Sequence, residues 1–207
     1  MPVTLVDNPL MRHKLGTLRN SEIASDTFRR TLAQMSVQMF YEATRDLDSH
    51  PQTINGAFGS TEVQRINRKI ILVPLMRAGL GMSDPILELW PDASVGHIGI
   101  YRDKFLKNTV EYFFKLPKDV GQSRIYILDP IIATGDTAIA SIDRLKEAGC
   151  KNICFLSLLA SETGKNALMH FHSDVNLFTI CTTDTLNEAG YLQPGIGDVC
   201  SRYYNSQ

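Results

Sequence analysis

The sequence has few features of a secreted or membrane-inserted protein. No apolar run in the 207 residues approaches the ~20 residues that span a bilayer, and residues 1–16 lack a basic region followed by an apolar one. The four cysteines form no CxxC pair, and the chain contains no Asn-x-Ser/Thr glycosylation site. These absences predict a cytoplasmic protein with free thiols, without a disulfide framework or a zinc site.

The sequence also lacks an excess of charge of either sign. It contains 21 Lys and Arg against 22 Asp and Glu, which gives a net charge of -1. A chain of this balance has no global field that attracts nucleic acid or an anionic membrane, and we expect neither as a partner. Any site for an anion must therefore be local.

The hydrophobic pattern alternates between strands and helices. Five short apolar segments, KIILVPL, SVGHIGIY, RIYILDP, NICFLSLLA and NLFTI, are separated in several places by helical patterns. We therefore expect an α/β fold, with a mostly parallel twisted sheet, helices on both faces and a single domain over residues 1–207. A helix is predicted over residues 27–45, capped by Thr27 or Asp26, and the turn formers in 48–60 predict a surface connection. Its apolar face would hold Phe28, Leu32, Met35, Met39 and Ala43.

The stretch LDPIIATGDT at 128–137 begins as a buried strand and ends in small and hydroxylated residues. In an open α/β sheet, ligands bind where such a loop leads from a strand into a helix. Unpaired amides at the helix start, together with Ala133 and Gly135, allow a phosphate to approach closely, and Thr134 and Thr137 add hydroxyl donors. Asp129 suits ribose hydroxyls or a water on bound magnesium; the alternative is that it caps the helix or turn. The stretch predicts a site for a ribose 5-phosphate.

Residues 127–138, ILDPIIATGDTA, resemble the phosphoribosyl diphosphate (PRPP) loop of type I phosphoribosyltransferases, in the form used by the uracil phosphoribosyltransferase family. The blocks NPLMRHKLGTLRN, YEATRDL, VPLMRAGLGM, VGHIGIYRD and GYLQPGIGD resemble the same family in the same order. The resemblance implies a type I phosphoribosyltransferase-like sheet with a small hood formed from terminal segments. It also implies transfer of the 5-phosphoribosyl group from PRPP to uracil N1, giving UMP and pyrophosphate in pyrimidine salvage, with Mg2+.

The resemblance assigns roles to individual residues. Arg77 and Arg102 each follow a strand, and arginine suits the bidentate stabilisation of a departing diphosphate. The residues implied in catalysis are Arg77, Arg102, Asp129 and Asp198. The residues implied in PRPP binding are Arg77, Arg102, Asp129, Pro130, Ile131, Ile132, Ala133, Thr134, Gly135, Asp136, Thr137 and Asp198. The residues implied in uracil binding are Tyr191, Leu192, Gly197, Asp198 and Val199.

Two further loops belong to this interpretation. In GYLQPGIGDV, Pro194, Gly195 and Gly197 leave the backbone open to the edge of a planar base. Such a slot would reject cytosine, whose amino group would oppose a backbone amide donor. Residues 102–117, with Lys104 and Lys107, predict a hairpin that folds over the ligand and excludes water.

Asp136 and the carboxyl-terminal tail depart from the pattern of the family, and Pro130 departs from many other type I relatives, which carry two adjacent acids at the strand end. Asp136 stands where members usually have a second glycine, and an inward carboxylate would repel the phosphate and raise the Michaelis constant for PRPP. Pro130 follows Asp129, as in the uracil-specific members, so magnesium would be held mainly by PRPP and water rather than by a protein metal site. The tail VCSRYYNSQ also differs from the small and acidic residues expected there.

The residues leave two other functions open. One is a phosphoribosyltransferase for another nucleobase, and the other is a non-catalytic PRPP-binding regulatory protein, which Asp136 and the altered tail would favour. Exposed apolar stretches and the resemblance favour a homodimer or homotetramer. GTP is an effector of some relatives, and the sequence does not decide whether it acts here.

Overall fold

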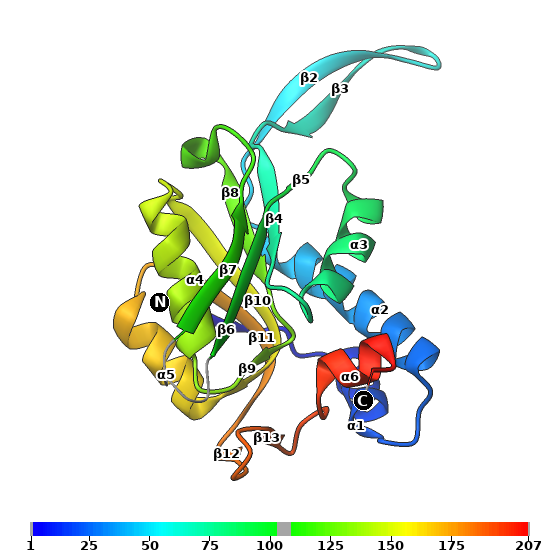
Figure 1. Cartoon of the computed structure of the whole chain (residues 1–207). Helices are drawn as coiled ribbons and strands as arrows, with labels where there is room; N and C mark the ends of the chain where they lie inside the picture. Colours follow the sequence, from blue (N-terminus) through cyan, green and yellow to red (C-terminus); the bar gives the residue numbers. More distant parts are fainter. Residues whose placement is uncertain (1, 103–108, 207) are drawn as a thin grey trace.

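The computed structural model describes residues 2–102 and 109–206, apart from the side chain of Arg102. Its centre is a sheet in which every neighbouring pair of strands is parallel (Figure 1). The order is β1 (Val3–Leu5), β11 (Asn176–Thr183), β10 (Asn152–Ser161), β8 (Arg124–Leu128), β4 (Ile70–Pro74) and β5 (Ser94–Val95), with the short β9 (Ile131–Ile132) also beside β10. The predicted parallel sheet is confirmed.

Apolar layers cover both faces of the sheet, because successive residues of a strand point to opposite sides. Leu72 of β4 packs in one cluster, whereas Ile71 and Val73 pack in the other. The first cluster includes residues of α1 (Pro9–Arg19), α2 (Ser25–Ala43), α3 (Leu80–Leu89) and α6 (Val199–Tyr204). The second includes residues of α4 (Asp136–Glu147), α5 (Glu162–Phe171) and β6 (His97–Arg102).

The helix predicted over residues 27–45 is present as α2, and its five predicted apolar residues are all buried. Its predicted cap is wrong. The helix begins at Ser25, and Ala24 occupies the N-cap without a hydrogen bond from any side chain in the described part of the chain. Asp26 instead lies in the first turn, where its charge favours the helix dipole.

Two hairpins interrupt the simple alternation. The segment SVGHIGIY divides into β5 and β6, and β6 pairs antiparallel with β7 (Thr109–Lys115). A hairpin is therefore present, but its first strand begins at His97 rather than in the predicted range 102–117. Lys104 and Lys107 lie outside the described residues, and the closure of the hairpin over a ligand stays a prediction. The segment 48–60 lies on the surface, as predicted, but it is a hairpin and not an irregular connection. It forms β2 (Ser49–Gly56) and turns at 57–58 into β3 (Gly59–Ile66), an arm that projects from the body (Figure 1).

The two ends of the chain form a small hood beside the carboxyl edge of the sheet (Figure 1). Arg202 of α6 donates hydrogen bonds to the carbonyls of Leu18 and Asn20, at the end of α1. The short strands β12 (Thr185–Leu186) and β13 (Leu192–Gln193) precede α6. The hood implied by the family resemblance is confirmed. Within residues 2–102 and 109–206, each helix is too short or too polar to cross a bilayer.

Candidate active site

The loop between β8 and α4 forms a cradle of backbone amides. Gly135 is the N-cap of α4, with φ of +91°, and no side chain among the described residues caps this helix. The first amides of α4 are therefore available to an anion. A cavity of about 110 Å³ opens beside them. Its lining consists of Asp129, Ile131, Ile132, Ala133, Thr134, Gly135, Thr137 and Ala138.

The junction of β10 and α5 contacts this cradle and supports it. The Ser161 hydroxyl donates to the Ala133 carbonyl and accepts a hydrogen bond of 2.8 Å from the Gly164 amide. A Cβ added to Gly164 would lie 2.3 Å from the Ala133 carbonyl oxygen, so only glycine allows this approach. Sequence reasoning missed this support, although the N-cap serine of α5 was a local signal.

Asp129 follows the last residue of β8 and lines the cradle. It does not cap α4, because Gly135 occupies the cap, but its carboxylate accepts a hydrogen bond from the Ile131 amide within the turn. Desolvation raises the pKa of Asp129 to about 7, and the amide of Ile131 opposes this rise. The carboxyl therefore titrates near neutral pH.

Asp136, the first residue of α4, bonds within the loop. The Thr134 hydroxyl donates to its carboxylate at 2.9 Å, and the side chain of Asp136 is not part of the cavity lining within the described residues. Its negative charge in the first turn also suits the helix dipole. The carboxylate lies beside the predicted phosphate site rather than in it.

The turn between β4 and α3 lies next to Asp129. The Leu75 amide donates to the Leu128 carbonyl at 3.0 Å, and a Cβ on Gly79 would lie 2.1 Å from the same oxygen. This contact brings the exposed Arg77 to the carboxyl end of β8. Arg102 ends β6, which runs parallel to β4 through a bridge between Leu75 and Ile98. The side chain of Arg102 lies outside the described part, so the convergence of the two guanidinium groups stays a prediction.

The segment GYLQPGIGDV at residues 190–199 is called the base loop below. It meets the turn between β4 and α3 and the loop between β8 and α4 at one cavity of about 240 Å³. Gly197 has φ of +70°, and Asp198 caps α6 by accepting a hydrogen bond of 2.7 Å from the Ser201 amide. The Tyr191 hydroxyl donates to the other carboxylate oxygen of Asp198 at 3.3 Å. The lining includes all five predicted uracil residues and consists of Ala78, Asp129, Ile131, Ala133, Gly190, Tyr191, Leu192, Gly197, Asp198, Val199 and Cys200.

Cys200 lies where these three loops meet, and sequence reasoning missed it. Burial raises the pKa of its thiol, while the charge of Arg77 opposes that rise and the charges of Asp198 and Asp129 add to it. One side chain is thus within electrostatic reach of three predicted site residues from separate segments. The only signal in the sequence was its position directly after the base loop.

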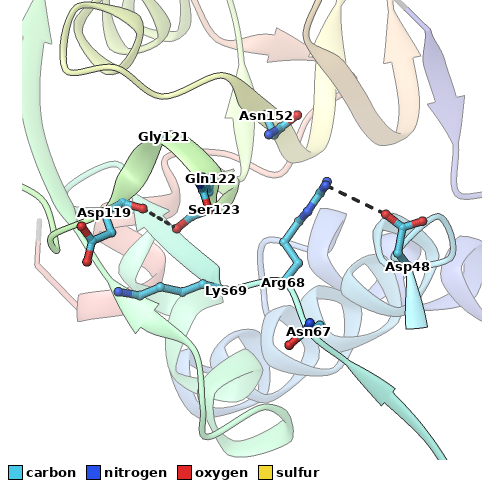
Figure 2. A pocket seen from close by; sticks show the side chains of 9 residues that line it. All are labelled: Asp48, Asn67, Arg68, Lys69, Asp119, Gly121, Gln122, Ser123 and Asn152. Atoms are coloured by element: carbon cyan, nitrogen blue, oxygen red, sulfur yellow. Dashed lines mark hydrogen bonds and ion pairs between the residues drawn. The ribbon is translucent and has the colours of Figure 1, made fainter. Parts of the chain in front are cut away.

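A larger cavity, of about 680 Å³, lies at the opposite edge of the sheet (Figure 2). It is formed where β4, β8 and β10 begin, so none of the predicted site residues lines it. Arg68 points toward Asp48, with 3.9 Å between guanidinium and carboxylate (Figure 2). The lining consists of Asp48, Asn67, Arg68, Lys69, Asp119, Gly121, Gln122, Ser123 and Asn152.

Comparison with known proteins identifies the family. The model of the family described as uracil phosphoribosyltransferase matches residues 5–206. The chain belongs to the uracil phosphoribosyltransferase family. Proteins named uracil phosphoribosyltransferase from Fervidobacterium nodosum and Levilactobacillus brevis are 44% and 41% identical to it over 204 residues. The alignments cover 98% of this chain and 99% and 98% of those relatives, so membership of the uracil phosphoribosyltransferase family extends over nearly the whole chain.

Solved structures share the fold of this chain. The AQ2163 protein from Aquifex aeolicus superposes with a TM-score of 0.91 at 28% identity, over 98% of this chain and 97% of that one. A hypoxanthine-guanine phosphoribosyltransferase from Bacillus anthracis superposes with a TM-score of 0.52 at 11% identity, over 76% and 80%. At that identity the match shows the fold alone. The chain thus has the type I phosphoribosyltransferase fold, as predicted.

Proposed function

We propose that the protein transfers the 5-phosphoribosyl group of PRPP to N1 of uracil. The bond from C1 of the ribose to the diphosphate oxygen breaks, the bond from C1 to uracil N1 forms, and N1 loses its proton to water. The products are UMP and pyrophosphate, as pyrimidine salvage requires. The observation that carries the proposal is the single cavity lined by the base loop, the PRPP loop and the turn that bears Arg77, in a member of this family.

In this proposal the cradle and the turn after β4 bind PRPP. The 5-phosphate lies at the amides of 133–137, where the uncapped start of α4 favours an anion. Arg77 and Arg102 hold the diphosphate and stabilise its charge as it leaves. Asp129 accepts hydrogen bonds from the ribose hydroxyls, and Asp198 approaches the ribose from the base loop. No His or Lys in the recognised motifs is an obvious general base, so alignment and charge stabilisation supply the catalysis, and Asp198 assists through water.

Mg2+ is proposed to bind together with PRPP, held mainly by PRPP and water. Among the described residues, no three His, Cys, Asp or Glu side chains gather in a way that could hold a metal ion. Pro130 follows Asp129, so this strand end offers one carboxylate, which suits a hydrogen bond from a metal-bound water. The ion would neutralise part of the diphosphate charge.

Uracil is proposed to bind edge-on to the backbone of residues 197–199, which line the cavity, whereas Pro194 and Gly195 are not part of its described lining. The alternating carbonyl and imide groups of uracil match the amides and carbonyls of such a loop. Cytosine would place its amino group against an amide donor and leave both unpaired, which costs roughly 1–3 kcal/mol. Tyr191 and Leu192 border the same cavity.

We also propose how the protein occurs in the cell. The chain acts as one domain in the cytoplasm, and it assembles into a homodimer or homotetramer. Phe58 supports the assembly, because this large apolar side chain at the end of the β2–β3 arm is fully exposed. Light scattering would measure the assembly. GTP is included as an effector on the family resemblance alone, and adding GTP to the assay tests it.

The deciding experiment follows uracil and labelled PRPP with Mg2+ and the purified protein. We expect UMP and pyrophosphate in equal amounts, and no comparable turnover of cytosine, orotate, hypoxanthine or guanine. Turnover of a purine but not of uracil would contradict the proposed base. Tight PRPP binding without release of pyrophosphate would instead indicate a regulatory PRPP-binding protein.

A further inference from the structure

The short helix α6 connects the base loop with the turn that bears Arg77. It begins directly after Asp198, which caps it, and it ends at Tyr204. The Tyr204 hydroxyl donates a hydrogen bond of 3.1 Å to the backbone carbonyl of Arg77. The two ends of one helix therefore contact two different parts of the candidate site.

Other contacts fix α6 without the help of the Tyr204 hydroxyl. Arg202 donates to the Leu18 carbonyl and, at 2.9 Å, to the Ile196 carbonyl, and its guanidinium lies 4.5 Å from the centre of the Phe28 ring. The Tyr203 ring packs so closely on α3 that a Cβ on Gly81 would lie 2.5 Å from it. Because these contacts hold the helix, loss of one hydroxyl at its end leaves the fold intact.

Tyr204 contacts Arg77 in two ways. The Arg77 carbonyl accepts from the Tyr204 hydroxyl and also, at 3.2 Å, from the Leu80 amide at the start of α3. The guanidinium carbon of Arg77 lies 5.8 Å from the centre of the Tyr204 ring, within the range of a cation–π contact. The hydroxyl thus fixes the backbone of Arg77, and the ring limits the directions its exposed side chain can take.

We propose that Tyr204 is a positioning residue that holds Arg77 in the orientation needed to stabilise the departing diphosphate. This inference rests on the proposed role of Arg77. Stabilisation of a developing charge depends on donors that are already in place, so a loosened Arg77 lowers the rate of the chemical step. The base loop is not altered by the change, because Asp198 keeps its bond to Ser201.

The test is the substitution Tyr204→Phe, which removes the hydroxyl and keeps the ring. We expect kcat to fall several-fold and pyrophosphate to inhibit less strongly, while the Michaelis constant for uracil and the melting temperature stay near those of the parent. Tyr203→Phe is the matched control on the same helix and should leave kcat unchanged. A fall in melting temperature as large in Tyr204→Phe as in Tyr204→Ala would indicate a structural role and overturn the proposal.

A double-mutant cycle then separates this inference from the proposed function. If Tyr204 acts through Arg77, Tyr204→Phe has no further effect on kcat once Arg77→Ala is present. Independent, multiplicative losses would contradict positioning. If Arg77→Ala itself leaves kcat unchanged, the proposed role of Arg77 fails. If Arg77→Ala lowers kcat and Tyr204→Phe does not, only the inference about Tyr204 fails.

Discussion

The two edges of the central sheet differ in how their polar groups are satisfied. At the amino edge, the larger cavity is lined by charged and amide side chains, and some of them have partners in the protein: Arg68 points toward Asp48 (Figure 2), and Lys69 donates to the Lys118 carbonyl. At the carboxyl edge, two smaller cavities share Asp129, Ile131 and Ala133, and the smaller of the two adjoins the start of α4, which no described side chain caps. The backbone amides at this helix start are where we propose that an anion binds.

If the site lies at the carboxyl edge, as we propose, cavity volume is a poor guide to its position in this fold. In a parallel sheet every strand leads into its helix at the carboxyl edge, so the amides of helix starts gather there. At the amino edge the carbonyl ends of helices and the turns before strands gather instead. We therefore propose that the 5-phosphate and the diphosphate of PRPP, and the uracil base, bind at the two smaller cavities.

The sharpest contrast between the edges comes from replacing one arginine at each. Arg77→Ala should lower kcat by about 10²-fold or more, as for loss of a preorganised donor at a developing negative charge. Arg68→Ala, the matched change at the amino edge, should leave kcat and both Michaelis constants near the parent values. Steady-state assays with uracil and PRPP measure both. A large loss in Arg68→Ala with none in Arg77→Ala would reverse the assignment.

A pair of glycines distinguishes the effect of backbone strain on stability from an effect on PRPP binding. Gly135 and Gly149 lie at opposite ends of α4, and both have φ of +91°. Alanine at either should destabilise the fold by about 1–2 kcal/mol, because the left-handed region disfavours a side chain. Gly135→Ala should also raise the Michaelis constant for PRPP, since its Cβ would lie 3.0 Å from the Gly164 carbonyl oxygen and shift the cradle.

The Gly149→Ala variant is the control, because no described atom lies within 4 Å of the added Cβ. It should show the loss of stability in thermal unfolding without a change in PRPP kinetics. An equal rise of the Michaelis constant for PRPP in the two variants would argue against a phosphate site at the start of α4.

The raised pKa of Asp129 predicts that the use of PRPP depends on pH near neutrality. With a pKa of about 7, the carboxyl gains its charge as the pH rises from about 6 to 8, so kcat/KM for PRPP should rise over this interval. Asp129→Asn should be less active and should lose this rise. The pKa of Asp129 in the folded protein lies above the ordinary value of 3.8, so ionisation of this carboxyl lowers the stability of the fold as the pH increases toward 7.

Asp129→Asn should therefore melt at a higher temperature than the parent at pH 8, with the difference shrinking toward pH 4. Thermal scans across that range provide the measurement. A parent enzyme whose PRPP kinetics do not change between pH 6 and 8 would contradict the raised pKa.

The smallest effect is expected at Asp136. Its carboxylate accepts from Thr134 beside the cradle, so Asp136→Asn should lower the Michaelis constant for PRPP by only about two- to five-fold, the range of a partly exposed charge interaction. The same change removes a favourable charge from the first turn of α4 and should cost a few tenths of a kcal/mol. A higher Michaelis constant in this variant would show that Asp136 assists PRPP binding.

The sequence predicted those features that depend on local pattern. The buried stripe of α2 and the strands of the parallel sheet followed from periodicity, and the phosphate cradle followed from Gly135 and the small residues around it. The β2–β3 arm was missed because its strands are exposed and carry no alternating apolar pattern. Its turn residues, Gly56 and Gly59, suggested a loop instead.

The missed parts of the site depend on contacts between distant segments. Ser161 supports Ala133 from another crossover, and Tyr204 contacts Arg77 across more than half of the chain. Cys200 acquires its surroundings only when three loops meet. No single stretch of sequence contains the information on such contacts, because they arise from tertiary packing.

Amide hydrogen exchange in the presence of PRPP, Mg2+ and uracil would test the central assignment most directly. We expect slower exchange in residues 131–138 and 191–200 when the ligands bind, with no change in 67–69 and 119–123. Protection confined to the amino edge, or an unchanged exchange rate at the start of α4 under saturating PRPP, would contradict the assignment.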